Sequence, residues 1–158
     1  MKILYCGDLV GRAGRSVVNK HIKEIREKYN VDVVLVNGEN AAHGFGLSSS
    51  IAQDLLDNGV DGIFLGNHVW EHRDIYPFLD TCKKIIRPLN LPANLPGKGA
   101  QLLEVNGKKI LIVVPIPRKF FVSTNQSSPR QADTGEKIGE YTIYNATGFL
   151  GALERDCL

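Results

Sequence analysis

The chain has 158 residues, 43% of them hydrophobic, which is enough for one compact domain with a buried core and too little for two comfortable ones. Its 19 basic and 17 acidic residues leave a formal net charge of +2, so no strong field favours a bulk polyelectrolyte role on nucleic acid or on an anionic membrane. Partners are therefore expected at local sites.

The three cysteines, Cys6, Cys82 and Cys157, lie far apart and lack the paired spacing of a zinc site or a disulfide framework. The apolar run that follows Met1 and Lys2 is too short for a signal-peptide core, and no later apolar run is long enough to cross a membrane. These features predict a soluble protein of the reducing cytoplasm with no membrane partner.

The first half of the chain alternates apolar runs with amphipathic stretches. Residues 2–6, 31–36 and 62–65 are short, apolar runs of the kind that forms buried strands. Residues 15–29 and 48–58 have helical spacing, and the second of these opens with serines and closes near a glycine. Strands that alternate with helices predict right-handed crossovers and a parallel α/β sheet covered on both faces.

The next part of the chain is less regular. Residues 71–84 predict a further helix whose proline lies in the first turn or at a kink. Residues 87–99 contain three prolines and two glycines, which predicts an ordered or extended loop. Residues 101–105 and 109–114 then predict a β-hairpin around an Asn-Gly turn.

The character of the sequence changes after Pro115. Residues 115–137 lose all periodicity and are rich in polar residues, a composition typical of a linker or a disordered stretch. Residues 141–153 are apolar enough to pack, and helix and strand fit them equally well. The expected organisation is one region over residues 1–114 and a divergent, partly disordered tail over residues 115–158.

The first three predicted strands end alike, each with a glycine followed by polar side chains. The three ends are Cys6-Gly7-Asp8, Asn37-Gly38-Glu39-Asn40 and Leu65-Gly66-Asn67-His68. Because the carboxyl ends of parallel strands share one edge of a sheet, these side chains are expected to converge although they are distant in sequence. Glycine lets the chain turn sharply and lets a ligand approach the backbone.

Carboxylate and amide oxygens together with imidazole suit Mg²⁺, Mn²⁺ or iron, and one carboxylate can bridge two such ions. Two metals held in this way can clamp a phosphoryl group and generate hydroxide for in-line attack. Taken singly, Asp8 and Glu39 would more often cap helices, and Asn67 would more often make a turn. The agreement of three strand ends favours a two-metal phosphoesterase site.

Four segments carry a resemblance to a known family. They are GDLVGRAGR (7–15), VNGENAAHGFGL (36–47), GNHVWEHRDI (66–75) and RPLNLPANLPGKG (87–99). These segments closely resemble the YmdB-type metallophosphoesterases, without gaps from Met1 to about Val114. The resemblance implies the N-terminal βαβ portion of a calcineurin-like α/β sandwich with an incomplete C-terminal half. It also implies a dinuclear centre of Fe, Mn or Mg, and phosphodiesterase activity on small substrates such as 2′,3′-cyclic nucleotides.

The same resemblance assigns a role to individual residues. Asp8 and Asn40 resemble ligands of the first metal. Glu39 resembles the carboxylate that bridges both metals, and Asn67 resembles a ligand of the second. His68 resembles the general acid, a role that suits imidazole because it exchanges protons near neutral pH.

Other polar residues near these motifs have less specific patterns. His21, His43 and His72 are expected to be structural or solvated, although His43 lies in a glycine-rich turn where it could touch substrate. Arg12 and Arg15 lie close to the presumed site, where either could bind phosphate, and solvated side chains are the more common outcome.

The family pattern also requires three later histidines, and this chain has no histidine after His72. The four oxygen ligands alone would bind transition metals weakly. An inactive, truncated relative is therefore the main alternative. The loss of strands would leave an apolar face or an unpaired edge, which would favour self-association into a homo-oligomer.

A dinucleotide-binding domain is a further alternative, since the first strand leads into three glycines. Gly7, Gly11 and Gly14 have the spacing G-x-x-x-G-x-x-G, however, where G-x-G-x-x-G is required. Asp8 would also direct its charge towards the pyrophosphate.

Overall fold

The computed structural model describes residues 1–105, 107–114, 136–138 and 141–143. The central sheet contains β1 (Ile3–Cys6), β2 (Val33–Asn37), β3 (Gly62–Phe64) and β4 (Ile85–Ile86). These strands are all parallel, and their order in the sheet is their order in the chain. They are connected by α1 (Gly11–Tyr29), α2 (Ser49–Asp57) and α3 (Ile75–Thr81). The predicted parallel α/β sheet is confirmed.

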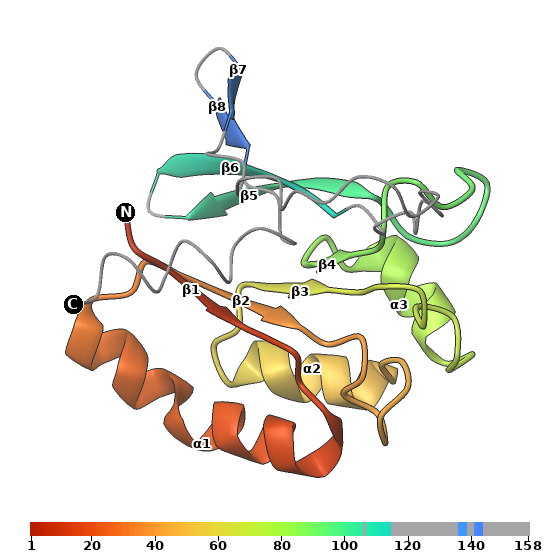
Figure 1. Cartoon of the computed structure of the whole chain (residues 1–158), viewed down its shortest axis with the longest axis horizontal. Coiled ribbons are helices and arrows are strands. Elements are labelled where there is room, and N and C mark those ends of the chain that lie inside the picture. The colour runs from red at the N-terminus through yellow and green to blue at the C-terminus, as the bar shows by residue number, and fades with distance from the viewer. Residues whose placement is uncertain (106, 115–135, 139–140, 144–158) are drawn as a thin grey trace, which may run out of the picture.

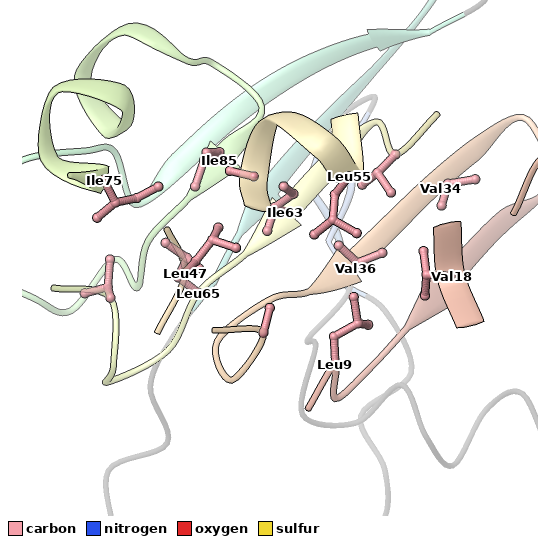
Figure 2. Close-up of a cluster of buried hydrophobic side chains, with 14 of the residues drawn as sticks. Leu9, Val18, Val34, Val36, Leu47, Leu55, Ile63, Leu65, Ile75 and Ile85 are labelled. Carbon is pink, nitrogen blue, oxygen red and sulfur yellow. The ribbon is translucent and has the colours of Figure 1, made fainter. Parts of the chain in front are cut away.

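The helices pack against one face of this sheet, with α1 and α2 beneath it in Figure 1 and α3 beside β4. Right-handed crossovers that always step to the next strand in the same direction place successive helices on the same face. The core on this side joins helix residues such as Val18 and Leu55 to strand residues such as Val36 and Ile63 (Figure 2).

An antiparallel hairpin covers the other face of the sheet (Figure 1). It consists of β5 (Ala100–Val105) and β6 (Lys108–Val113), and Gly107 in the turn has a φ of +70°, which glycine adopts without steric cost. Leu103, Ile110 and Ile112 are buried against the strands. The sheet is thus covered on both faces, as predicted, with a hairpin on the second.

Several element boundaries differ from the sequence expectation. Helix α1 begins at Gly11 and not at residue 15, because its first turn carries no apolar periodicity to mark it. Helix α3 is shorter than the expected range 71–84, and Pro77 lies in its first turn, where a missing N–H is tolerated. Strand β4 was not predicted, since two residues show no periodicity.

The polar segment at residues 115–137 and the apolar segment at residues 141–153 lie largely outside the described residues. What is described there is the antiparallel pair β7 (Glu136–Ile138) and β8 (Tyr141–Ile143). A boundary at residue 114 stays a prediction. In the described part of the chain, no helix combines the length and apolarity that a membrane span requires.

Candidate metal centre

The carboxyl ends of β1, β2 and β3 lie side by side at one edge of the sheet, and backbone hydrogen bonds continue beyond them. The Leu9 N–H donates to the Asn37 carbonyl at 3.0 Å, and the Gly38 N–H donates to the Phe64 carbonyl at 2.9 Å. The loops that carry the predicted site residues therefore leave the sheet as neighbours.

Asp8 and Asn40 are in direct contact across two of these loops. The Asn40 Nδ2 donates a hydrogen bond to Asp8 Oδ2 at 2.5 Å, and the Asn40 carbonyl accepts the Gly11 N–H at 2.9 Å. The second bond ties the start of α1 to the end of β2. Two residues predicted to share one metal are therefore brought together from sites 32 positions apart.

Glu39 makes the corresponding contact between β2 and β3. Its carboxylate lies so close to Gly66 that a Cβ on that glycine would fall 2.0 Å from Oε2. Any other residue would displace the carboxylate, so this position requires glycine. Since Gly66 directly precedes Asn67 and His68, the Glu39 carboxylate lies against the loop that carries both.

Asn37 and Tyr5 support the Glu39 loop from the end of the strands. Asn37 Oδ1 accepts the Glu39 N–H at 3.0 Å, and the Asn37 side chain also forms a hydrogen bond with the Tyr5 hydroxyl. Burial raises the pKa of Tyr5, and the charge of Asp8 and, more weakly, that of Glu39 raise this pKa further. Both carboxylates therefore lie within electrostatic reach of one half-buried hydroxyl.

His68 lies beside this group with its ring partly exposed. Its Nδ1 is 3.2 Å from Glu71 Oε1, and its ring meets that of Phe45 edge to face, with centroids 5.1 Å apart. The contact with Glu71 at Nδ1 orients the imidazole. The side chain is 28% exposed, which leaves it accessible to a ligand.

The donor chemistry of the group fits a hard divalent ion. Asp8 and Glu39 supply carboxylate oxygens, and Asn40 and Asn67 offer amide oxygens, the ligand types that Mg²⁺ and Mn²⁺ prefer. The described residues contain no group of three His, Cys, Asp or Glu side chains that could hold a metal. The four predicted ligands therefore supply oxygen donors only.

The remaining polar residues near the motifs have structural roles or are exposed. Arg15 donates to the Ala41 carbonyl at 2.5 Å and is partly buried, so the expectation of a solvated side chain was wrong for this residue. Arg12 is exposed, as expected. His72 Nε2 contacts the Phe45 carbonyl at 3.0 Å, which agrees with a structural role.

Sequence reasoning did not assign a role to Tyr5, Asn37 or Phe45. Asn37 lies within a strand-end motif, where its short polar side chain could have been recognised as a turn former. Phe45 lies between two glycines in a loop, and a large aromatic residue in that setting was the available signal. Tyr5 gave no signal, since aromatic residues are common in strands.

A family model described as "YmdB-like protein" matches residues 4–141 of the chain. The chain belongs to the YmdB-like family. The match extends beyond Val114, where the sequence motifs alone ended the resemblance.

This YmdB-like chain is also similar to individual proteins. It is 40% identical over 113 residues to the 2′,3′-cyclic-nucleotide 2′-phosphodiesterase of Bacillus subtilis (strain 168), an alignment that covers 72% of this chain and 43% of that protein. The chain thus spans less than half the length of this relative. The family relationship is to phosphatases and phosphodiesterases.

Two crystal structures share the fold of this YmdB-like chain. A hypothetical protein from Thermus thermophilus has a TM-score of 0.70 and 33% identity, with 99% of this chain and 54% of that chain covered. A novel phosphatase from Mycoplasma pneumoniae has a TM-score of 0.67 and 32% identity, with 99% of this chain and 52% of that chain covered. The expected metallophosphoesterase-type α/β fold is therefore confirmed for this part of the family's length.

Proposed function

We propose that the chain carries part of a divalent-metal-dependent phosphodiesterase centre. Its metal ligands are Asp8, Glu39, Asn40 and Asn67, and His68 is its general acid. The observation that supports this most is that Asp8 contacts Asn40 while Glu39 lies against Gly66, at the sheet edge where open α/β folds bind ligands. The substrate class is a small phosphodiester such as a 2′,3′-cyclic nucleotide, since that is the substrate named for the Bacillus relative.

Each residue has a distinct part in this proposal. A bound divalent ion supplies Lewis-acid activation and charge neutralisation at the phosphate. Asp8 and Asn40 hold it from the ends of β1 and β2, and Glu39 holds it from the side facing β3. His68 Nε2 donates a proton to the leaving alkoxide, while Glu71 keeps the ring in place through Nδ1.

A metal-poor, inactive relative is the second candidate. All four histidines of the chain lie at or before His72, so the chain itself offers mainly oxygen ligands to metals. Two carboxylates and two amides bind a divalent ion weakly when no imidazole or further carboxylate joins them. Self-association into a homo-oligomer stays a prediction under either candidate.

The dinucleotide-binding alternative is not favoured by the geometry at α1. A pyrophosphate would need the first amides of the helix, but the Gly11 N–H donates to the Asn40 carbonyl. Stabilisation by Mn²⁺ and not by NAD in a thermal melt is the expected result, and the reverse would revive this alternative.

The test of the proposed function combines metal content with hydrolysis. The purified chain is loaded with Mn²⁺, and its hydrolysis of 2′,3′-cAMP and bis-p-nitrophenyl phosphate is measured before and after EDTA. We expect activity that requires added Mn²⁺ and disappears with EDTA. Absence of both Mn²⁺ binding and hydrolysis supports the inactive candidate, and activity that ignores EDTA contradicts both.

A further inference from the structure

The loop after Asn40 is a tight turn with a fixed position at the site. Within it, the Gly44 N–H donates to the Asn40 carbonyl at 3.1 Å, the Phe45 N–H to the Ala42 carbonyl at 3.0 Å, and the Ala42 N–H to the Gly46 carbonyl at 2.9 Å. Gly44 and Gly46 have φ values of +95° and +71°, which only glycine adopts readily. The side chain between them is therefore positioned by the backbone.

Two further contacts fasten this turn to the loop that carries His68. The Phe45 carbonyl is 3.0 Å from His72 Nε2. A Cβ on Gly46 would fall 2.9 Å from the His68 carbonyl oxygen and 2.9 Å from the Glu71 Cβ, so the two loops touch at this glycine. The turn is consequently held against the His68 loop at Phe45 and Gly46.

The side chain presented by this turn is an exposed aromatic ring. Phe45 is 61% exposed, and its ring meets the His68 imidazole at 5.1 Å and 79°. A phenylalanine ring gains free energy when it leaves water, and this ring is held in water beside the proposed general acid. Single exposed apolar residues are common on protein surfaces, but this one is anchored by backbone and side-chain contacts next to catalytic chemistry.

We propose that Phe45 is a stacking platform for the nucleobase of the substrate. The inference rests on the proposed function, because it assigns the part of the substrate that lies beyond the scissile phosphate. The platform makes the site selective for nucleotides over phosphodiesters that lack an aromatic ring. Stacking uses the π-face that every base possesses, so the platform accepts all four bases and favours the larger purines.

The chemistry of a 2′,3′-cyclic nucleotide requires such a platform to lie close to the acid. The base is attached to the ribose carbon adjacent to the one that carries the 2′ oxygen, so only one sugar ring separates base and phosphate. A ring in van der Waals contact with His68 satisfies this requirement, and Phe45 is in that position.

The first experiment compares two cyclic phosphodiesters that differ in the base. With Mn²⁺ present, kcat/KM is measured for 2′,3′-cAMP and for glycerol 1,2-cyclic phosphate, using the wild type, Phe45→Leu and Phe45→Trp. We expect Phe45→Leu to lower kcat/KM for 2′,3′-cAMP about tenfold and to leave the glycerol ester unchanged, and Phe45→Trp to retain the wild-type ratio. Equal losses on both substrates would overturn the proposal, because Phe45 would then be supporting the site.

A matched control removes another exposed aromatic ring. Tyr29, at the end of α1, is 54% exposed and is distant in the fold from the carboxyl ends of the strands (Figure 1). Tyr29→Leu is expected to leave both substrates unaffected. A base-specific loss in this variant would show that removal of any surface ring has the same effect, and would overturn the assignment to Phe45.

The second experiment separates the stacking surface from the proposed activity. Binding of adenosine 3′-monophosphate and of inorganic phosphate is measured by calorimetry in the same variants. We expect Phe45→Leu to weaken nucleotide binding about tenfold and to leave phosphate binding unchanged. A wild type that hydrolyses nothing but binds the nucleotide through Phe45 contradicts only the proposed function. If Phe45→Leu hydrolyses and binds nucleotides as well as the wild type does, only the stacking platform is contradicted. A wild type that binds no nucleotide also overturns the stacking platform.

Discussion

The carboxylate of Glu39 and the Cα of Gly66 are packed so closely that a methyl group on the glycine would fall 2.0 Å from Oε2. The contact joins the end of β2 to the end of β3, and it is a packing contact with the backbone of Gly66. The absence of a side chain at Gly66 therefore makes room for the carboxylate that is proposed to bind metal.

Replacing this glycine tests that relationship. Gly66→Ala is expected to lower Mn²⁺ affinity about tenfold or more, because the new methyl group displaces the Glu39 carboxylate. Glu39→Gln removes the charge itself and is expected to cause a similar or larger loss. Affinity is measured by calorimetry on the wild type, both single variants and the double variant.

The double variant identifies the mechanism. If Gly66→Ala acts through Glu39, it adds little to the loss already caused by Glu39→Gln. Fully additive losses would mean that the glycine acts on the metal by another route, and the proposed relationship would be wrong.

His68→Ala separates the general acid from the metal ligands. It is expected to leave Mn²⁺ affinity unchanged and to lower turnover of 2′,3′-cAMP by about 10²–10⁴-fold, since the alkoxide then leaves without a proton donor. Bis-p-nitrophenyl phosphate releases a stable phenolate and should lose much less. A loss of the same factor on both substrates would remove the support for the acid assignment.

The hairpin offers a test of the fold. Leu103 is buried against the sheet, whereas its neighbour Leu102 points away and is 49% exposed. Leu103→Ala is expected to lower the free energy of unfolding by about 2–5 kcal/mol and Leu102→Ala by about 0.5 kcal/mol or less, measured by urea denaturation. Equal effects would show that the hairpin does not cover the sheet in solution.

Asp74 predicts a pH-dependent contribution to stability. The Ser49 hydroxyl and then the Ser49 N–H, both bonded to Asp74 Oδ2, hold the pKa of this carboxyl below its ordinary value. Because the folded pKa is depressed, this contribution is complete above the unfolded pKa of about 3.9 and is lost as the pH falls through the folded pKa.

Asp74→Asn is expected to lower the free energy of unfolding by at most about 1 kcal/mol at pH 7, since the carboxylate caps α2 from an exposed position. The difference between variant and wild type should narrow below about pH 4. Urea denaturation at pH 7 and below about pH 4 measures this difference in the free energy of unfolding. A difference that grows on acidification would contradict the depressed pKa of Asp74.

The sequence predicted those elements whose signals are local. Ser48 was expected at the start of a helix, and its Oγ does accept the Ile51 N–H of α2 at 3.4 Å. The hairpin predicted over residues 101–105 and 109–114 was likewise confirmed, with Gly107 at a φ of +70°. Strand β4 was missed because Ile85 and Ile86 are recognisable as a strand only by their pairing with β3, which is a tertiary contact.

The site follows the same division. The approach of Asp8 to Asn40 could be predicted, because parallel strands bring their carboxyl ends to one edge. Two other contacts could not be predicted, because each depends on side-chain packing between loops. They are the close packing of the Glu39 carboxylate against Gly66 and the edge-to-face contact of Phe45 with His68. The roles of these residues in metal binding and catalysis stay predictions.

The succession of β1, β2 and β3 in both chain and sheet has a consequence for how the polypeptide acquires its shape. Each of these strands pairs with the strand that precedes it in the chain, so β1, β2 and β3 need no later segment in order to pair with one another. The segment from Asp8 to His68 precedes the hairpin in the chain and is synthesised before it. The groups proposed to bind metal can therefore come together during translation, before β5 and β6 have been made.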